Sequence, residues 1–133
     1  MTLEDAATAS VLVVDDAATV RLYHSTLLRD AGFRVEEAAN GLEAVEAALA
    51  TTFDLFVIDV NMPIMNGYDC VETLRSDTVG TGAPVLMVST EDRPEDADRA
   101  YQAGANLYLV KPVTAQRLTR VATMLVAANG GAQ

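Results

Sequence analysis

Asp59 and the pair Asp15-Asp16 are the residues of this chain that are best placed to do chemistry. Asp59 follows the mainly apolar run 53–58, and Asp15-Asp16 follow the apolar run 10–14. A carboxylate at the exit of a buried strand is positioned to react rather than to pack. Carboxylates at two strand ends would act together if they shared a divalent cation and one of them accepted a phosphoryl group.

Three carboxylates that converge on one point raise one another's pKa, and a hard divalent cation removes this conflict. Mg²⁺ prefers oxygen ligands and is usually held by one or two carboxylates together with phosphate oxygens. Asp15, Asp16 and Asp59 are therefore candidate magnesium ligands, and the backbone carbonyl of Asn61 is a further candidate. The site that they predict is incomplete without a phosphoryl group.

Polar side chains also end two later apolar runs. Ser89 follows the run 84–88 with a hydroxyl, and Lys111 follows the run 106–110 with an ammonium. A phosphoryl group on Asp59 needs such contacts, because phosphoryl transfer depends mainly on positioning and charge neutralisation. Acids, a hydroxyl and an ammonium thus stand at the ends of four predicted strands.

The elements that must position these residues alternate along the chain. Apolar runs rich in β-branched residues, or alternating with polar ones, predict strands at 10–14, 33–38, 53–58, 84–88 and 106–110. Helical spacing predicts helices at 17–30, 41–50, 67–75, 92–102 and 114–128, with start residues Asp16, Asn40 and Thr114 and an end at Gly104. Such alternation predicts an α/β fold, a parallel sheet with helices on both faces and ligands beyond the carboxyl ends of its strands.

The composition fits one domain. We expect it at 10–128 of the 133 residues, between a flexible leader 1–9 and a flexible tail 129–133. The net charge of −10 argues against nucleic acid and anionic membranes, which attract basic faces. The only cysteine, Cys70, cannot form an intramolecular disulfide, and no signal peptide is visible, so we expect a cytoplasmic protein. His24, the only histidine, is expected to be a surface or half-buried helix residue.

Five motifs, in order, resemble those of the receiver domains of two-component response regulators. They are Val13–Asp16, Asp59–Gly67, Met87–Glu91, Gly104–Tyr108 and Lys111-Pro112. Each motif is weak alone, but together they cover nearly the whole chain. The resemblance implies a three-layer flavodoxin-like (βα)5 fold with strand order 2-1-3-4-5, in which the first and third strands are neighbours.

The resemblance also implies roles for the acidic residues. Asp59 would accept a phosphoryl group from a phosphohistidine of a histidine kinase. Mg²⁺ would be held by Asp15, Asp16, Asp59 and the backbone carbonyl of Asn61. The protein would then catalyse only its own phosphorylation and dephosphorylation, and in that sense it would not be an enzyme.

Three further residues receive roles from the same resemblance. Lys111 would pair with the phosphoryl group, and Ser89 would move toward it. Tyr108 would swing inward into the space that Ser89 leaves and so act as the switch. The Lys111-Pro112 peptide bond is expected to be cis.

Within the family, the chain resembles the single-domain chemotaxis type, which is called CheY-like. Asn61 and Glu91 match the pair that this type uses with rapid dephosphorylation. Three positions depart from the common pattern, because Thr90 replaces Ala, Val113 replaces Phe and Asn66 replaces Asp. These departures concern the choice of partner rather than the chemistry.

The expected function is therefore a stand-alone, monomeric response regulator whose phosphorylation switches protein binding, with a flagellar motor switch protein as the output partner in chemotaxis. A phosphorelay shuttle, a phosphate sink and an adaptor receiver that acts on a kinase or phosphotransfer protein remain alternatives. An aspartyl-phosphate phosphatase is disfavoured, because the aspartates are adjacent and the chain leaves no room for a cap. A flavin site is disfavoured because Asp15-Asp16 would repel a flavin phosphate.

Overall fold

The computed structural model describes residues 9–130, so residues 1–8 of the predicted leader and 131–133 of the predicted tail lie outside the description. The strands are β1 (Ser10–Val14), β2 (Arg34–Ala38), β3 (Leu55–Asp59), β4 (Val85–Ser89) and β5 (Leu107–Val110). The helices are α2 (Ala18–Asp30), α3 (Gly41–Ala50), α4 (Gly67–Arg75), α5 (Pro94–Ala103) and α6 (Ala115–Gly130). Of the helices so described, none is long and apolar enough to cross a membrane.

All five strands are parallel, in the order β2-β1-β3-β4-β5, which confirms the expected fold. The central strands β3 and β4 are buried along their whole length, as their continuous apolar sequences predict. The edge strand β2 is mostly exposed and carries charged residues. β1 and β3 are neighbours, with Val14 opposite Ile58, so the residues that follow them emerge side by side.

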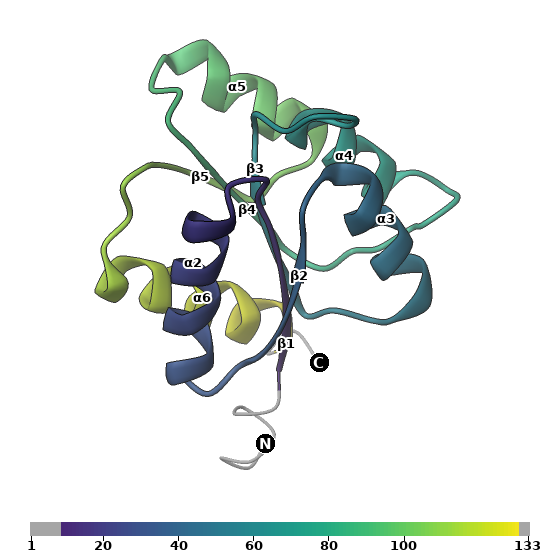
Figure 1. Ribbon diagram of the computed structural model, residues 1–133. Coiled ribbons are helices and arrows are strands. Elements are labelled where there is room, and N and C mark those ends of the chain that lie inside the picture. Colours follow the sequence, from purple (N-terminus) through teal and green to yellow (C-terminus); the bar gives the residue numbers. More distant parts are fainter. Residues whose placement is uncertain (1–8, 131–133) are drawn as a thin grey trace.

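Helices cover the two faces of the sheet unequally. In Figure 1, α2 and α6 lie on one face and α3, α4 and α5 lie on the other. Alternate residues of β1 point to opposite faces, so Val11 and Val13 pack with Leu28 and Leu118, and Leu12 packs in the cluster beneath α3 to α5. The core is thus two apolar layers separated by the sheet.

Near both ends of the described chain and at α5, the structure differs slightly from the boundaries predicted for single elements. Ala9, placed in the leader by the sequence prediction, is buried, and its carbonyl accepts a hydrogen bond from the Arg34 amide at 2.9 Å. Helix α6 runs to Gly130, two residues beyond its predicted end. Helix α5 begins at Pro94 rather than at residue 92, because proline at the first helical position has a suitable fixed φ and no amide that needs a partner.

Two of the three predicted helix starts are confirmed. Asn40 Oδ1 accepts a hydrogen bond from the Glu43 amide at 2.9 Å, and Thr114 Oγ1 accepts one from the Arg117 amide at 3.2 Å. Both side chains satisfy an amide that the first helical turn leaves without a partner. The predicted end of α5 is also confirmed, since Gly104 follows the helix with a left-handed φ of 118°.

The prediction that Asp16 caps α2 is wrong. The residue before α2 is Ala17, in an extended conformation and without a side-chain cap. The Ala17 amide donates instead to Asp15 Oδ1 at 2.9 Å. Asp15 thus accepts the hydrogen bond at the start of α2. The Asp16 side chain remains exposed, and its carboxylate lies close to those of Asp15 and Asp59.

The buried face of α2 also differs from the expectation. Tyr23 is 47% exposed, whereas the adjacent His24 is only 3% exposed. The prediction that His24 lies at the surface or half buried is therefore wrong. The helix is rotated so that His24, Ser25 and Leu28 face the protein interior.

Candidate functional site

Asp15 and Asp59 lie at the carboxyl edge of the sheet, on neighbouring strands. Asp59 is the last residue of β3, and Asp15 directly follows β1. Both are buried, whereas Asp16 is exposed, and carboxylate oxygens of all three lie within 4.8 Å of one another. The predicted convergence of these side chains is confirmed, and among the described residues this is the one cluster with the ligand types and spacing of a metal site.

Lys111 connects two of these carboxylates. Its Nζ donates to Asp15 Oδ2 at 2.8 Å and to Asp59 Oδ1 at 3.1 Å. The Lys111 amide donates to the carbonyl of Ser89 at 2.7 Å, which fixes the start of the loop after β5. The bond from Lys111 to Pro112 is cis, as expected from the resemblance.

The electrostatics of the cluster favour one more cation. Burial and then the negative charge of Asp15 raise the pKa of Asp59 to about 6, against the opposing effect of Lys111. Burial alone would lower the pKa of Lys111, but its hydrogen bonds and the charges of Asp15 and Asp59 outweigh burial and raise it. Three carboxylates and one ammonium leave two uncompensated negative charges when all are ionised. A divalent cation would balance them.

The loop after Asp59 is held close to the strand by a glycine. The Gly67 amide donates to the Val60 carbonyl at 2.8 Å, and a Cβ at Gly67 would collide with the carbonyl of Asp59. Only glycine allows this approach. Within the loop, the exposed Ile64 has a left-handed φ of 71°, which is costly for a β-branched residue.

Asn61 projects from the same loop toward the end of β4. Its Nδ2 donates to Glu91 Oε1 at 3.1 Å, so the pair that the sequence singled out is in contact. This contact involves the side chain of Asn61, and its backbone carbonyl takes no part in it.

Ser89 and Tyr108 are joined through the backbone of Glu91. The Glu91 amide donates to Ser89 Oγ at 3.1 Å, and the Tyr108 hydroxyl donates to the Glu91 carbonyl at 2.8 Å. Ser89 is fully buried, while Tyr108 is half-buried at the edge of the core. Ser89 and Tyr108 are thus connected through one residue.

Two contributors to the site were not found from the sequence. Arg21 of α2 donates to the Asp15 carbonyl through its Nη1 and to Glu37 of β2 through its Nε at 3.1 Å. Arg21 thus ties the loop that carries Asp15 to the helix and to the neighbouring strand. His24 lies beside Lys111, where both line one cavity. Neither residue belongs to a recognisable motif, and the only signal was their place on the first helix.

These observations define a doubly wound α/β protein with an acidic, lysine-bridged site at the carboxyl edge of a parallel sheet. The chain belongs to the response regulator receiver domain family, whose model matches residues 11–123.

Known proteins support this assignment. The chain is 43% identical to chemotaxis protein CheY-3 of Vibrio cholerae over 109 residues, covering 81% of this chain and 84% of that protein. The crystallised chemotaxis response regulator CheY4 of V. cholerae superimposes with a TM-score of 0.83 at 38% identity, covering 89% of this chain and 98% of that one. The receiver domain of the sensor histidine kinase PA1611 of Pseudomonas aeruginosa, 27% identical with a TM-score of 0.83 over 90% and 98% of the chains, has a magnesium ion coordinated in its active-site cleft.

Proposed function

We propose that this protein is a response regulator that accepts a phosphoryl group on Asp59 from a phosphohistidine of a histidine kinase. The observation that carries the proposal is the meeting of Asp15, Asp16 and Asp59, within 4.8 Å, with the ammonium of Lys111. Phosphoryl transfer needs a positioned nucleophile and neutralised charge, and this arrangement supplies both.

Asp59 has the state and the geometry of a nucleophile. Its pKa of about 6 leaves the carboxylate ionised above neutral pH. Oδ1 accepts the Lys111 ammonium at 3.1 Å, and Oδ2 accepts no hydrogen bond from any residue that the structure describes. In the proposed reaction Oδ2 forms a bond to phosphorus as the bond from phosphorus to the donor imidazole nitrogen breaks, and Lys111 neutralises charge on the transferred group.

The donor set fits the magnesium ion that this function requires. Asp15, Asp16 and Asp59 offer hard oxygen ligands, the kind that Mg²⁺ prefers, and leave open positions for phosphoryl oxygens and water. When bound, Mg²⁺ would offset the carboxylate charges and polarise the phosphoryl group. The Asn61 carbonyl is proposed as the remaining protein ligand. The magnesium ion of the PA1611 receiver domain supports this part of the proposal.

The readout that we propose begins at Ser89. If its hydroxyl turns to the phosphoryl group, the Glu91 amide loses its acceptor, and Glu91 also holds the Tyr108 hydroxyl through its carbonyl. Tyr108 would then leave its half-buried position and move inward, which changes the surface over α5, β5 and α6. The phosphoryl group must favour the switched state by several kcal/mol to populate it almost fully.

The proposed output is protein binding in chemotaxis, with a flagellar motor switch protein as partner. Support comes from the relatives named as chemotaxis proteins, of which CheY-3 is 43% identical over 81% of this chain. We propose a monomer that acts in the cytoplasm, for which the buried and unpaired Cys70 is suited.

The test is phosphorylation by acetyl phosphate in the presence of Mg²⁺, followed by mass spectrometry of the intact protein. The wild type and the exposed-site control Asp77→Asn should gain one phosphoryl group, and Asp59→Asn should gain none. Omitting Mg²⁺ or adding a chelator should abolish the gain. Phosphorylation of Asp59→Asn at the wild-type rate would refute the assignment of the acceptor. Affinity capture with phosphorylated protein then tests the output, by the retention of motor rather than kinase components.

A further inference from the structure

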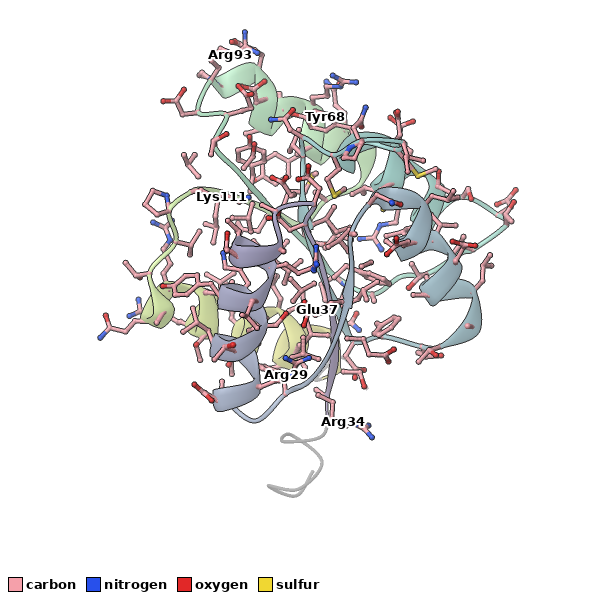
Figure 2. The ribbon with its side chains drawn as sticks, in the orientation of Figure 1. Arg29, Arg34, Glu37, Tyr68, Arg93 and Lys111 are labelled. Carbon is pink, nitrogen blue, oxygen red and sulfur yellow. The ribbon has the colours of Figure 1, made fainter. Side chains whose placement is uncertain are left out.

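A cavity of about 320 Å³ lies between α2 and the segment that follows β5. Val20, Tyr23 and His24 line it from α2, and Thr90 and the segment 111–113 line it from the loops after β4 and β5. Lys111, labelled in Figure 2 on the chain between β5 and α6, lies where this cavity meets the carboxylate site. We call this space the His24 cavity.

His24 contributes a polar side chain to the cavity. The residue is 3% exposed and lines the cavity, yet it forms no hydrogen bond with any residue in the described part of the chain. Its aromatic neighbour is Tyr23, and the centroids of the Tyr23 and His24 rings lie 5.7 Å apart. Ser25 Oγ is the one fully buried side-chain atom without a partner among the described residues, so the ring nitrogens of His24 are accessible from the cavity. A neutral imidazole carries one donor and one acceptor, and a ligand with one polar group can pair with one of them.

The charges around the cavity favour an uncharged ligand. Burial lowers the pKa of His24 and the Lys111 ammonium lowers it further, so the imidazole is neutral at neutral pH. Lys111 is already bound to Asp15 and Asp59, at 2.8 and 3.1 Å. A ligand carboxylate would approach an excess of negative charge from these residues, so an anion is disfavoured.

The size and walls of the cavity suit one aromatic ring. Cavities of about 150 Å³ bind benzene, and ordinary ligand sites begin at about 300 Å³. The walls are mainly apolar and include Val20, Val113 and the half-exposed Tyr23. Val113 is important for the volume, because a larger side chain there would occupy the space.

A second and larger cavity, of about 630 Å³, lacks these properties. It lies at the start of β1 and β2, away from the carboxylates. Its Arg29 is already bonded to the Val35 carbonyl at 3.0 Å and to Glu37 at 3.4 Å, and Figure 2 shows Arg29 and Glu37 close together. No buried side chain without a partner faces it among the residues described.

We propose that the His24 cavity is a binding site for a small, neutral, single-ring aromatic molecule that carries one hydroxyl or N–H group, with His24 as its hydrogen-bond partner and Val113 in its lining. The site is independent of the function proposed above, since it requires neither a phosphoryl group nor a metal ion. Phenol is the simplest probe of this class, and toluene is its match without the hydroxyl.

The test is a titration of the ¹⁵N-labelled protein with phenol and with toluene, followed by amide NMR shifts. We expect saturable shifts at the lining residues with a dissociation constant for phenol of about 1 mM or lower. His24→Leu keeps the size of the side chain and should remove the preference for phenol over toluene, by about tenfold if one hydrogen bond is lost. Val113→Phe fills the cavity and should weaken both probes at least about tenfold.

Three results would overturn the proposal. They are shifts that do not saturate by about 10 mM phenol, unchanged binding to Val113→Phe, and a preference for phenol that survives in His24→Leu. Thermal melts establish that each variant is folded. If Val113→Phe does not fold, Val20→Phe, at a half-buried residue that also lines the cavity, provides the same volume test.

Discussion

Replacing Asp59 by asparagine is expected to make the protein more stable at neutral pH when magnesium is absent. The Asp59 side chain is buried, and burial and Asp15 raise its pKa from 3.8 to about 6. The ionised form of Asp59 is therefore unfavourable in the folded protein. Asparagine preserves the shape of the side chain and removes the charge, so the variant isolates this electrostatic cost.

The pKa difference gives both the sign and the size of the effect. Between the unfolded and the folded pKa, only the folded protein binds the proton, so the free energy of unfolding falls as pH rises from about 4 to about 6. The difference between 3.8 and about 6 corresponds to about 3 kcal/mol, at about 1.4 kcal/mol for each pKa unit. Solvent screening at the mouth of the site reduces this, and we expect a gain of about 1–3 kcal/mol for Asp59→Asn at about pH 8.

The loss of the contact with Lys111 opposes this gain but should not cancel it. Removing one partner of a buried ion pair costs about 3–5 kcal/mol when it leaves the other charge alone. Lys111 is not left alone in Asp59→Asn, because its shorter contact is to Asp15, at 2.8 Å rather than 3.1 Å. The variant therefore keeps a paired lysine and loses one of two crowded carboxylates.

The assay is urea unfolding of both proteins at about pH 4 and about pH 8, at constant ionic strength and with a chelator present. Asp77→Asn, at an exposed position, is the control for removing one charge far from the site and should shift stability little. Adding Mg²⁺ should stabilise the wild type more than Asp59→Asn. If Asp59→Asn is less stable than the wild type at the higher pH without Mg²⁺, the Lys111 contact outweighs burial and repulsion, and the reasoning is wrong.

Substitutions at three further sites, two of them with a comparison substitution, test the local structure by urea unfolding. Gly67→Ala should lose about 2 kcal/mol or more, because its Cβ would collide with backbone, whereas Gly82→Ala meets open space and should change little. Ser25→Ala should gain about 0.5–1.5 kcal/mol, since its buried hydroxyl has no partner, while Ser76→Ala should lose stability because its hydroxyl donates to a carbonyl. Asn66→Ala should lose about 1 kcal/mol with the cap of α4. The opposite sign in any of these would contradict the contact on which it rests.

The carboxylate cluster and the sheet could be predicted because they depend on chain order and strand ends. Asp15 and Asp59 follow apolar strands, and parallel strands end at one edge, so their meeting needed only the strand order. That order came from the family resemblance and not from the apolar pattern. The position of Lys111 at that edge followed in the same way, whereas its contacts with Asp15 and Asp59 are known from the structure.

The orientation of α2 could not be predicted in the same way. Val20, Tyr23 and His24 are close in helical spacing, and the rotation of the helix depends on what packs against it from α6 and from the chain after β5. Tyr23 fits the spacing of the apolar residues in this helix better than His24 does, but Tyr23 is the more exposed of the two. Asp16 was taken as a cap because its type and position suited one, yet Asp15 satisfies the Ala17 amide first.

The backbone and the side chain of Glu91 contact different residues. The amide and carbonyl connect Ser89 to Tyr108, and the carboxylate contacts only Asn61 among these residues. In the function proposed here, a mutation at this position could change how long a signal persists without altering how it is relayed, because any residue except proline supplies the same backbone groups. Among related proteins, the lifetime of the phosphorylated state could then change by substitution at this one position. The path from Ser89 to Tyr108 would stay the same.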